Sequence, residues 1–414
     1  MVQKKRIEWI DTLKGFSMYT IVLCHVNVYT PLRNWLVSFN MPIYFMTSGA
    51  TLNIEKVRKT PFNQYFSALF KRLIVPYMWL QMLSFLTRYA VNLAGAHKEV
   101  PVVDYLKGIL IGNNKIIGTP SNPLYYIYML FLAQIGLWIV IRVTKGNKGY
   151  MAAILTAFSI VSVCTQNIAL PWHINGVPNV MLSIFIGRLL MDVYLQNKRY
   201  INRMSNGMCI LVCAVLFAVG YITLRLNGTP STHGNKFGDD YIVYLIGGFS
   251  TCVAFALVAM RLRVGKLFSF VGMNTLFYMG IHKPVLLLFE EIFEKYEDKM
   301  LFAVPASIVC FLLLVPLAKV ANKYFPYING NPVKEETTLI KLGKYLAVAA
   351  AWAVPYMYFN NHFMDGFLRE SIGMMLLSAV AYIVAVVVAT TLINKYAPFI
   401  FLSDDNKINK AVNS

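Results

Sequence analysis

The sequence has few charged residues for its length, and acidic residues are the scarcest of them. Asp, Glu, Lys and Arg together make up 14% of the 414 residues, and only 19 of these side chains are acidic while 38 are basic. A soluble globular chain is about 25% charged. The shortage argues against the large solvated surface that soluble domains require.

Motifs of several common chemistries are also missing. The sequence contains no P-loop, no GxGxxG before a helix and no HExxH, so nothing indicates a nucleoside triphosphate, a dinucleotide or a zinc protease. The six cysteines include no CxxC pair and fall in apolar runs. This pattern predicts reduced thiols in a core, with neither a disulfide framework nor a metal site.

Apolar residues are abundant instead. They make up 57% of the chain, against about 45–50% in soluble proteins, and they gather in runs that approach the roughly 20 residues a membrane-spanning helix needs. The sequence therefore predicts an all-α, polytopic integral membrane helix bundle of about twelve transmembrane helices. The expected spans are 9–28, 37–53, 73–93, 123–143, 151–167, 177–194, 207–226, 241–260, 267–289, 301–320, 342–359 and 372–393. Pro42 and Gly49 lie in the second span, where we expect a broken or tilted helix.

The distribution of basic residues predicts the orientation. If the N-terminus is cytoplasmic, about 25 Lys and Arg fall inside and about 10 outside, as the positive-inside rule requires. We expect a multi-pass protein of the plasma membrane, of the bacterial inner membrane type, with both termini cytoplasmic. The net charge of +19 then reflects topology. Nucleic-acid binding is not expected, because no soluble face combines basic and aromatic residues.

The first span carries three polar residues on one stripe. At about 100° and 1.5 Å per residue, Asp11, Lys14, Met18, Val22 and His25 share one face, with Lys14 and His25 about 16 Å apart. Ionisable groups inside spans are costly and mark functional sites. The alternatives are an interfacial ion pair for Asp11 and Lys14, and a satisfied core residue for His25. Further along, Arg188 and Asp192 are spaced for a structural i, i+4 ion pair.

These residues carry a resemblance to a known family. The first span reads "IEWIDTLKGFSMYTIVLCH" and is followed by "FNMPIYFMTSGATL", and this pair resembles the integral-membrane acyltransferase family 3, especially its fucose and polysaccharide O-acetyltransferase-like branch. The motif positions are Asp11, Lys14, Gly15 and His25; Met41, Pro42, Tyr44, Phe45, Ser48 and Gly49; Lys71, Arg72, Leu73 and Pro76; and Gly272, Asn274, Thr275, Tyr278, His282 and Pro284.

The resemblance has limits along the chain. Lys14 stands where the family more often has arginine, and Leu69 stands where an arginine often precedes the match to Arg72. The resemblance implies an acyltransferase-like domain of ten spans over residues 1–325. Residues 326–414 are then two additional transmembrane helices and a cytoplasmic tail, to which we assign no chemistry.

The resemblance implies a membrane O-acyltransferase that transfers acetyl from cytosolic acetyl-CoA to a hydroxyl of a cell-envelope or extracellular carbohydrate. Acetyl-CoA is then a co-substrate, and no bound cofactor is implied. Lys14, Lys71 and Arg72 would contact the phosphates of the donor, with Asp11 orienting Lys14. His25 is the expected general base, because the ordinary pKa of histidine lies nearest neutrality.

A second group of candidates lies on the ninth span. His282 is a second catalytic candidate, and Asn274 and Tyr278 share its helix face as acceptor or oxyanion contacts. The alternative for His282 is a satisfied interfacial histidine. The rival function is a transporter in which Asp, Lys and His line a proton or substrate pathway, although we find no internal repeat of the kind many transporters show.

Overall fold

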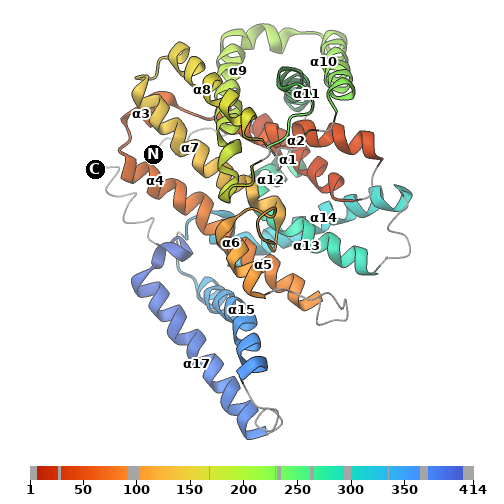
Figure 1. The fold of residues 1–414 in the computed structure, drawn as a ribbon. Coiled ribbons are helices and arrows are strands. Elements are labelled where there is room, and N and C mark those ends of the chain that lie inside the picture. Colours follow the sequence, from red (N-terminus) through yellow and green to blue (C-terminus); the bar gives the residue numbers. More distant parts are fainter. Residues whose placement is uncertain are drawn as a thin grey trace.

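The structure is a computed structural model, and it describes residues 7–26, 29–91, 102–166, 168–228, 230, 235–261, 265–292, 300–333, 335–363 and 372–403. These residues form helices joined by short connections (Figure 1). The helices are α1 (Glu8–Cys24), α2 (Thr30–Ala50), α3 (Ile54–Lys59), α4 (Phe62–Leu69), η1 (Phe70–Ile74), α5 (Val75–Val91), α6 (Val102–Ile111), η3 (Asn122–Leu124), α7 (Tyr125–Val143), α8 (Lys148–Cys164), η4 (Pro171–Gly176), α9 (Val177–Arg203), α10 (Asn206–Asn227), α11 (Tyr241–Arg261), α12 (Gly265–Met273), α13 (Thr275–Ile292), α14 (Met300–Tyr324), η6 (Pro326–Asn329), α15 (Thr338–Phe363), α17 (Ile372–Tyr396) and η7 (Pro398–Phe401).

The predicted all-α membrane class is confirmed. Each of the predicted spans falls on a helix, and in the described residues 6 helices are long and apolar enough to cross a bilayer. These six cover Asn122–Val143, Pro171–Arg203, Asn206–Asn227, Tyr241–Arg261, Phe302–Tyr324 and Leu377–Tyr396. Shorter apolar helices at Lys148–Cys164 and Thr275–Phe289 accompany them. The protein is therefore a polytopic helical membrane protein.

Several expected boundaries were wrong. The first helix ends at Cys24, so His25 lies in the turn that follows it and not inside a helix. We expected a broken or tilted helix at Pro42, and the break does not occur, because the second helix runs through Pro42. The ninth span is two helices, α12 and α13, which meet at Asn274. A π-helical turn, η1, precedes α5 and holds the basic pair Lys71 and Arg72.

Helix α1 lies in the middle of the bundle, and it contacts α2, α11, α12, α13 and α14 (Figure 1). Its closest neighbour is α12, because glycines let the two backbones touch. A Cβ atom on Gly15 would lie 2.0 Å from the carbonyl oxygen of Phe268, and one on Gly272 would lie 1.8 Å from that of Asp11. Close helix packing through small residues is the usual way to bring membrane helices together.

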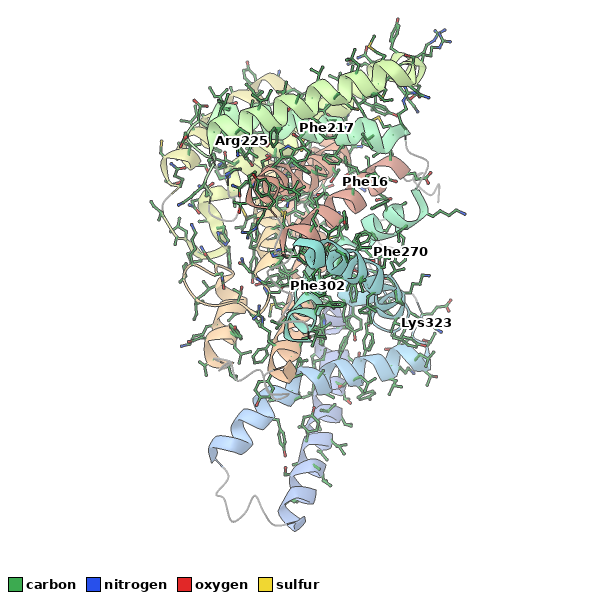
Figure 2. All side chains as sticks on the ribbon, turned by 90° about the vertical axis from the view of Figure 1, so that its right-hand side faces the viewer. Phe16, Phe217, Arg225, Phe270, Phe302 and Lys323 are labelled. Carbon is green, nitrogen blue, oxygen red and sulfur yellow. The ribbon has the colours of Figure 1, made fainter. Side chains whose placement is uncertain are left out.

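The last two helices form a hairpin that extends away from the other helices (Figures 1 and 2). Its base is fastened to α5, since the indole N–H of Trp79 donates to the carbonyl of Ile400 at 2.9 Å and its ring stacks on Phe401. Lys344 is buried at this base, where its ammonium group pairs with Glu336 and lies over the Phe401 ring. The hairpin is therefore joined to the helix that follows the basic turn η1.

The glycine contact between α1 and α12 leads to a stability prediction. Gly272→Ala should destabilise the protein by about 1–3 kcal/mol, because the added methyl group forces the two backbones apart. Gly207→Ala is the matched control, since a Cβ there meets no atom within 4 Å. Thermal unfolding of both variants in detergent checks this, and equal midpoints would contradict it.

Candidate active site

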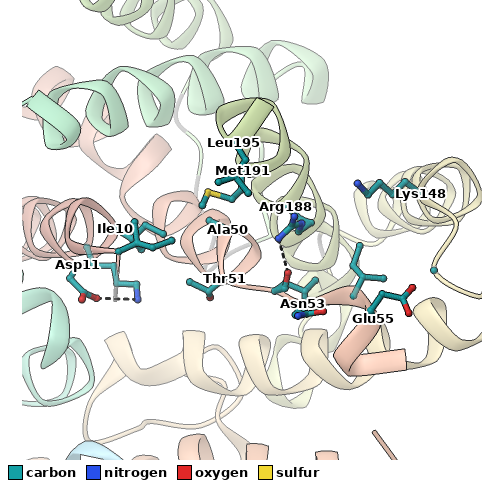
Figure 3. Close-up of a pocket in the computed structure, with 15 residues that line it drawn as sticks. Ile10, Asp11, Ala50, Thr51, Asn53, Glu55, Lys148, Arg188, Met191 and Leu195 are labelled. Carbon is teal, nitrogen blue, oxygen red and sulfur yellow. Dashed lines mark hydrogen bonds and ion pairs between the residues drawn. The ribbon is translucent and has the colours of Figure 1, made fainter. Parts of the chain in front are cut away.

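A cavity of about 720 Å³ opens beside the N-terminal end of α1 (Figure 3). Asp11 and Lys14 line it from α1, and the C-terminal end of α2, the starts of α3 and α8 and the middle of α9 complete its wall. The carboxylate of Asp11 lies 3.8 Å from the ammonium group of Lys14. The structure thus places the two residues as an ion pair, which is the arrangement required if Asp11 orients Lys14. The role of the pair in donor binding stays a prediction.

Two further cations line this cavity that the sequence analysis did not assign to a binding site. Arg188 of α9 donates to the carbonyl of Leu52 at 3.0 Å (Figure 3). It also forms the predicted ion pair with Asp192. Lys148, the first residue of α8, also pairs with Asp192, at 2.8 Å. The spacing of Arg188 and Asp192 in the sequence predicted their ion pair. It could not show that Arg188 and Lys148, which both pair with Asp192, line a cavity.

The predicted donor contacts Lys71 and Arg72 lie elsewhere. Both occupy the π-helical turn η1, and neither is among the residues that line the cavity at Lys14. Arg72 is close to the turn after α14, where a Cβ on Gly330 would lie 2.9 Å from the Arg72 carbonyl oxygen. Within the described structure, the basic groups that gather around the cavity are therefore Lys14, Lys148 and Arg188.

A second cavity, of about 170 Å³, lies at the other end of α1. His25 lines it, together with Arg33 and Asn40 of α2, Asn122 of η3 and Tyr125 at the start of α7. The backbone N–H of His25 donates to the carbonyl of Val22 at 3.1 Å, which closes the end of α1 and fixes the histidine at the cavity wall. The two cavities share no lining residue.

The structure brings His25 and His282 together. Their ring centroids are 5.0 Å apart, although 257 positions separate them in the sequence. His282 is fully buried, and its Nδ1 lies 2.8 Å from the carbonyl oxygen of Tyr278. A carbonyl can only accept, so Nδ1 carries the proton and the Nε2 of the neutral ring carries the lone pair.

The Nε2 atom of His282 has no hydrogen-bond partner within the described part of the chain. A buried polar atom without a partner is costly, and such atoms mark sites where water, a ligand or a reacting group binds. This nitrogen belongs to the ring that contacts His25, so the pair offers a proton acceptor inside the bundle. Neither histidine belongs to a cluster of metal-ligand residues in the described structure.

Pro284 explains how α13 holds His282 in place. Proline has no N–H, so the carbonyl of Gly280 loses its helical partner. The hydroxyl of Ser84 donates to this carbonyl at 3.0 Å, and Ser121 lies 3.5 Å from it. Polar side chains of neighbouring segments thus satisfy the freed group, as membrane helices require, and they fasten α13 to α5.

Asn274 and Tyr278, predicted to contact the acceptor, are both bonded within the protein. The amide of Asn274 donates to Phe270 and accepts from Asn322 and Asn329, at 2.6 and 2.8 Å. The hydroxyl of Tyr278 donates to the carbonyl of Phe311 at 3.3 Å. These bonds fasten the junction of α12 and α13 to α14 and η6, and the geometry favours a structural part for both residues.

The stripe between the two cavities is packed. Met18 and Val22 lie on it, as the helical period predicted, and both are completely buried. Tyr44 of α2 covers the same region, and its hydroxyl donates to the carbonyl of Lys14 at 2.9 Å. In this structure the line from Lys14 to His25 is therefore filled by side chains and is not an open channel.

Comparison with known families decides the assignment. Residues 7–319 match the acyltransferase domain family. The chain belongs to the acyltransferase 3 family. No curated protein and no solved structure matches it. The matched region contains both cavities and both histidines, and family membership implies acyl transfer from a donor to an acceptor.

The bonds of Asn274 generate a prediction for this acyltransferase. Asn274→Ala should cost about 1–3 kcal/mol of stability, because the amides of Asn322 and Asn329 lose a buried acceptor. Asn331→Ala is the control, since Asn331 makes only a 3.2 Å exposed bond to Asn322. Thermal unfolding and activity per folded molecule separate the two possible roles. If Asn274→Ala protein has normal stability but loses activity, Asn274 contacts the acceptor instead.

Proposed function

We propose that this member of the acyltransferase 3 family transfers acetyl from acetyl-CoA to a hydroxyl of a cell-envelope or extracellular carbohydrate. The observation that carries the proposal is the contact between His25 and His282, at the opposite end of α1 from a cavity that Lys14, Lys148 and Arg188 line. The choice of carbohydrate rests on the resemblance of the motifs to the fucose and polysaccharide O-acetyltransferase-like branch.

The donor would bind first, in the cavity at Lys14. Coenzyme A carries several phosphates, and ammonium and guanidinium groups bind phosphates through charge-assisted hydrogen bonds. Lys14, Lys148 and Arg188 supply three such groups around the cavity. The basic loops predict that this end of α1 faces the cytoplasm, where the donor is made. Lys71 and Arg72 would attract the donor from outside the cavity.

The acceptor would react at the other end of α1. His25 takes the proton of the acceptor hydroxyl as the oxygen attacks the thioester carbonyl and the new C–O bond forms. The C–S bond then breaks, and coenzyme A leaves as a thiolate that takes a proton back from the imidazolium. His282 contacts His25, and its Nε2 accepts a hydrogen bond that holds the base or the hydroxyl in position.

The proposal requires the thioester to pass from one cavity to the other. The separation of Lys14 and His25, about 16 Å along the helix, suits an extended pantetheine arm. Met18, Val22 and Tyr44 fill this line, so their side chains move aside when the arm enters. Methionine suits such a position, because its unbranched side chain adapts to new packing.

The role of His25 is tested by acetyl transfer. His25→Ala should lower the transfer of radiolabelled acetyl from acetyl-CoA to envelope glycans by about 10²–10⁴-fold, which is what a general base contributes. Binding of acetyl-CoA at the distant cavity should persist. If His25→Ala protein labels the glycans as fast as the unchanged protein, His25 takes no part in the chemistry. If the unchanged protein labels no glycan at all, a transport function is favoured instead.

The path along α1 has its own test. Met18→Trp should block the arm and lower transfer at least tenfold while acetyl-CoA still binds at Lys14. The larger side chain also overpacks the core, at a cost of about 1–3 kcal/mol, so the fraction of folded protein is measured alongside. Met18→Ala is the matched control and should keep transfer. Equal transfer by both variants would show that the donor reaches His25 by another route.

A further inference from the structure

The polar groups around His25 show which kind of acceptor the cavity fits. Arg33, Asn40 and Asn122 line it together with the histidine. No carboxylate is among the described residues that line this cavity. Sites that bind neutral sugars commonly use carboxylates to accept hydrogen bonds from hydroxyl groups, whereas this lining offers a guanidinium group and amides. The balance favours a ligand with negative charge.

Arg33 is held beside the base by its own hydrogen bond. Its Nε–H donates to the carbonyl of Cys24 at 3.2 Å, and Cys24 directly precedes His25. The bond fixes the plane of the guanidinium group at the end of α1 and leaves its two terminal nitrogens for other partners. Within the described part of the chain, no carboxylate forms an ion pair with Arg33.

The local charge adds to this preference. Arg33 lies within electrostatic range of the His25 imidazole. Arg33 is exposed and His25 is half-buried, so an anion that enters the cavity beside the histidine can reach the guanidinium group. A guanidinium group binds a carboxylate or a phosphate through two parallel N–H bonds, which also orients the bound group. The amides of Asn40 and Asn122 can then bind the hydroxyl groups of the same molecule.

We propose that the acceptor carries an anionic group, a carboxylate or a phosphate, next to the hydroxyl that is acylated, and that Arg33 binds this group. The proposal rests on the proposed acyl transfer, since it names the chemistry of the acceptor at the same site. Arg33 is then a residue that selects the substrate and orients it toward His25. It takes no proton.

The test uses the full-length protein in membranes, radiolabelled acetyl-CoA, and glycans extracted from the membranes of the cells that make the protein. One portion of glycan is left untreated. In a second portion the carboxylates are reduced to alcohols with carbodiimide and borohydride, and in a third the phosphate esters are cleaved with aqueous hydrogen fluoride. The unchanged protein is compared with Arg33→Gln, Arg33→Lys and Arg225→Gln. Arg225 is an exposed arginine near the end of α10 (Figure 2) that does not line the cavity.

We expect one of the two treatments to lower the label by roughly ten- to a hundredfold, which is the value of a charge-assisted hydrogen bond. Loss after carboxyl reduction identifies a sugar carboxylate, and loss after hydrogen fluoride identifies a phosphate. Arg33→Gln should lower label in untreated glycan by a similar factor, Arg33→Lys by less, and Arg225→Gln not at all. With glycan that has lost the anionic group, Arg33→Gln should cause no further loss.

Two results overturn the inference while acyl transfer stands. In the first, the unchanged protein labels both treated glycan portions as fully as the untreated one. In the second, Arg33→Gln protein, shown to be folded by thermal unfolding, labels untreated glycan as fully as the unchanged protein does. A failure of the proposed function looks different, because the unchanged protein then labels none of the three glycan portions.

Discussion

The contact between the backbones of α1 and α12 fixes the position of the groups assigned to function. Gly15 and Gly272 remove the side chains that would separate the two helices, so α1 is held in the centre of the bundle with Asp11 and Lys14 at one end and His25 at the other. Helix α13 follows α12 after the junction at Asn274 and carries His282 to the same end. A wider separation of α1 and α12 would disturb the pairing of the two histidines, because His25 follows the end of α1 and His282 lies on α13.

Local periodicity predicts part of this arrangement. A helical period places Asp11, Lys14 and His25 on one stripe with Met18 and Val22 between them, and the structure shows the predicted burial of these two apolar residues. The same reasoning finds the ion pair of Arg188 and Asp192. Each of these results depends on residues within one helix, where the geometry follows from sequence spacing alone.

Contacts between distant segments could not be predicted in this way. The spacing of Asn274, Tyr278 and His282 predicted one continuous helix face, but two helices meet at Asn274, whose side chain bonds to Asn322 and Asn329. A broken or tilted helix was expected at Pro42, yet α2 continues through it without a break. The cavity at Lys14 gathers residues from α1, α2, α8 and α9, so spacing alone could not identify Lys148 and Arg188 as its lining.

We propose that the donor and the acceptor use opposite ends of α1, and therefore opposite sides of the membrane. The most direct test uses protein in sealed proteoliposomes of one orientation, with acetyl-CoA on the side of the Lys14 cavity and envelope glycans, which cannot cross the bilayer, on the other side. We expect labelled glycan under this arrangement and none when the two reactants exchange sides. Label only when both reactants share one side would contradict this proposal.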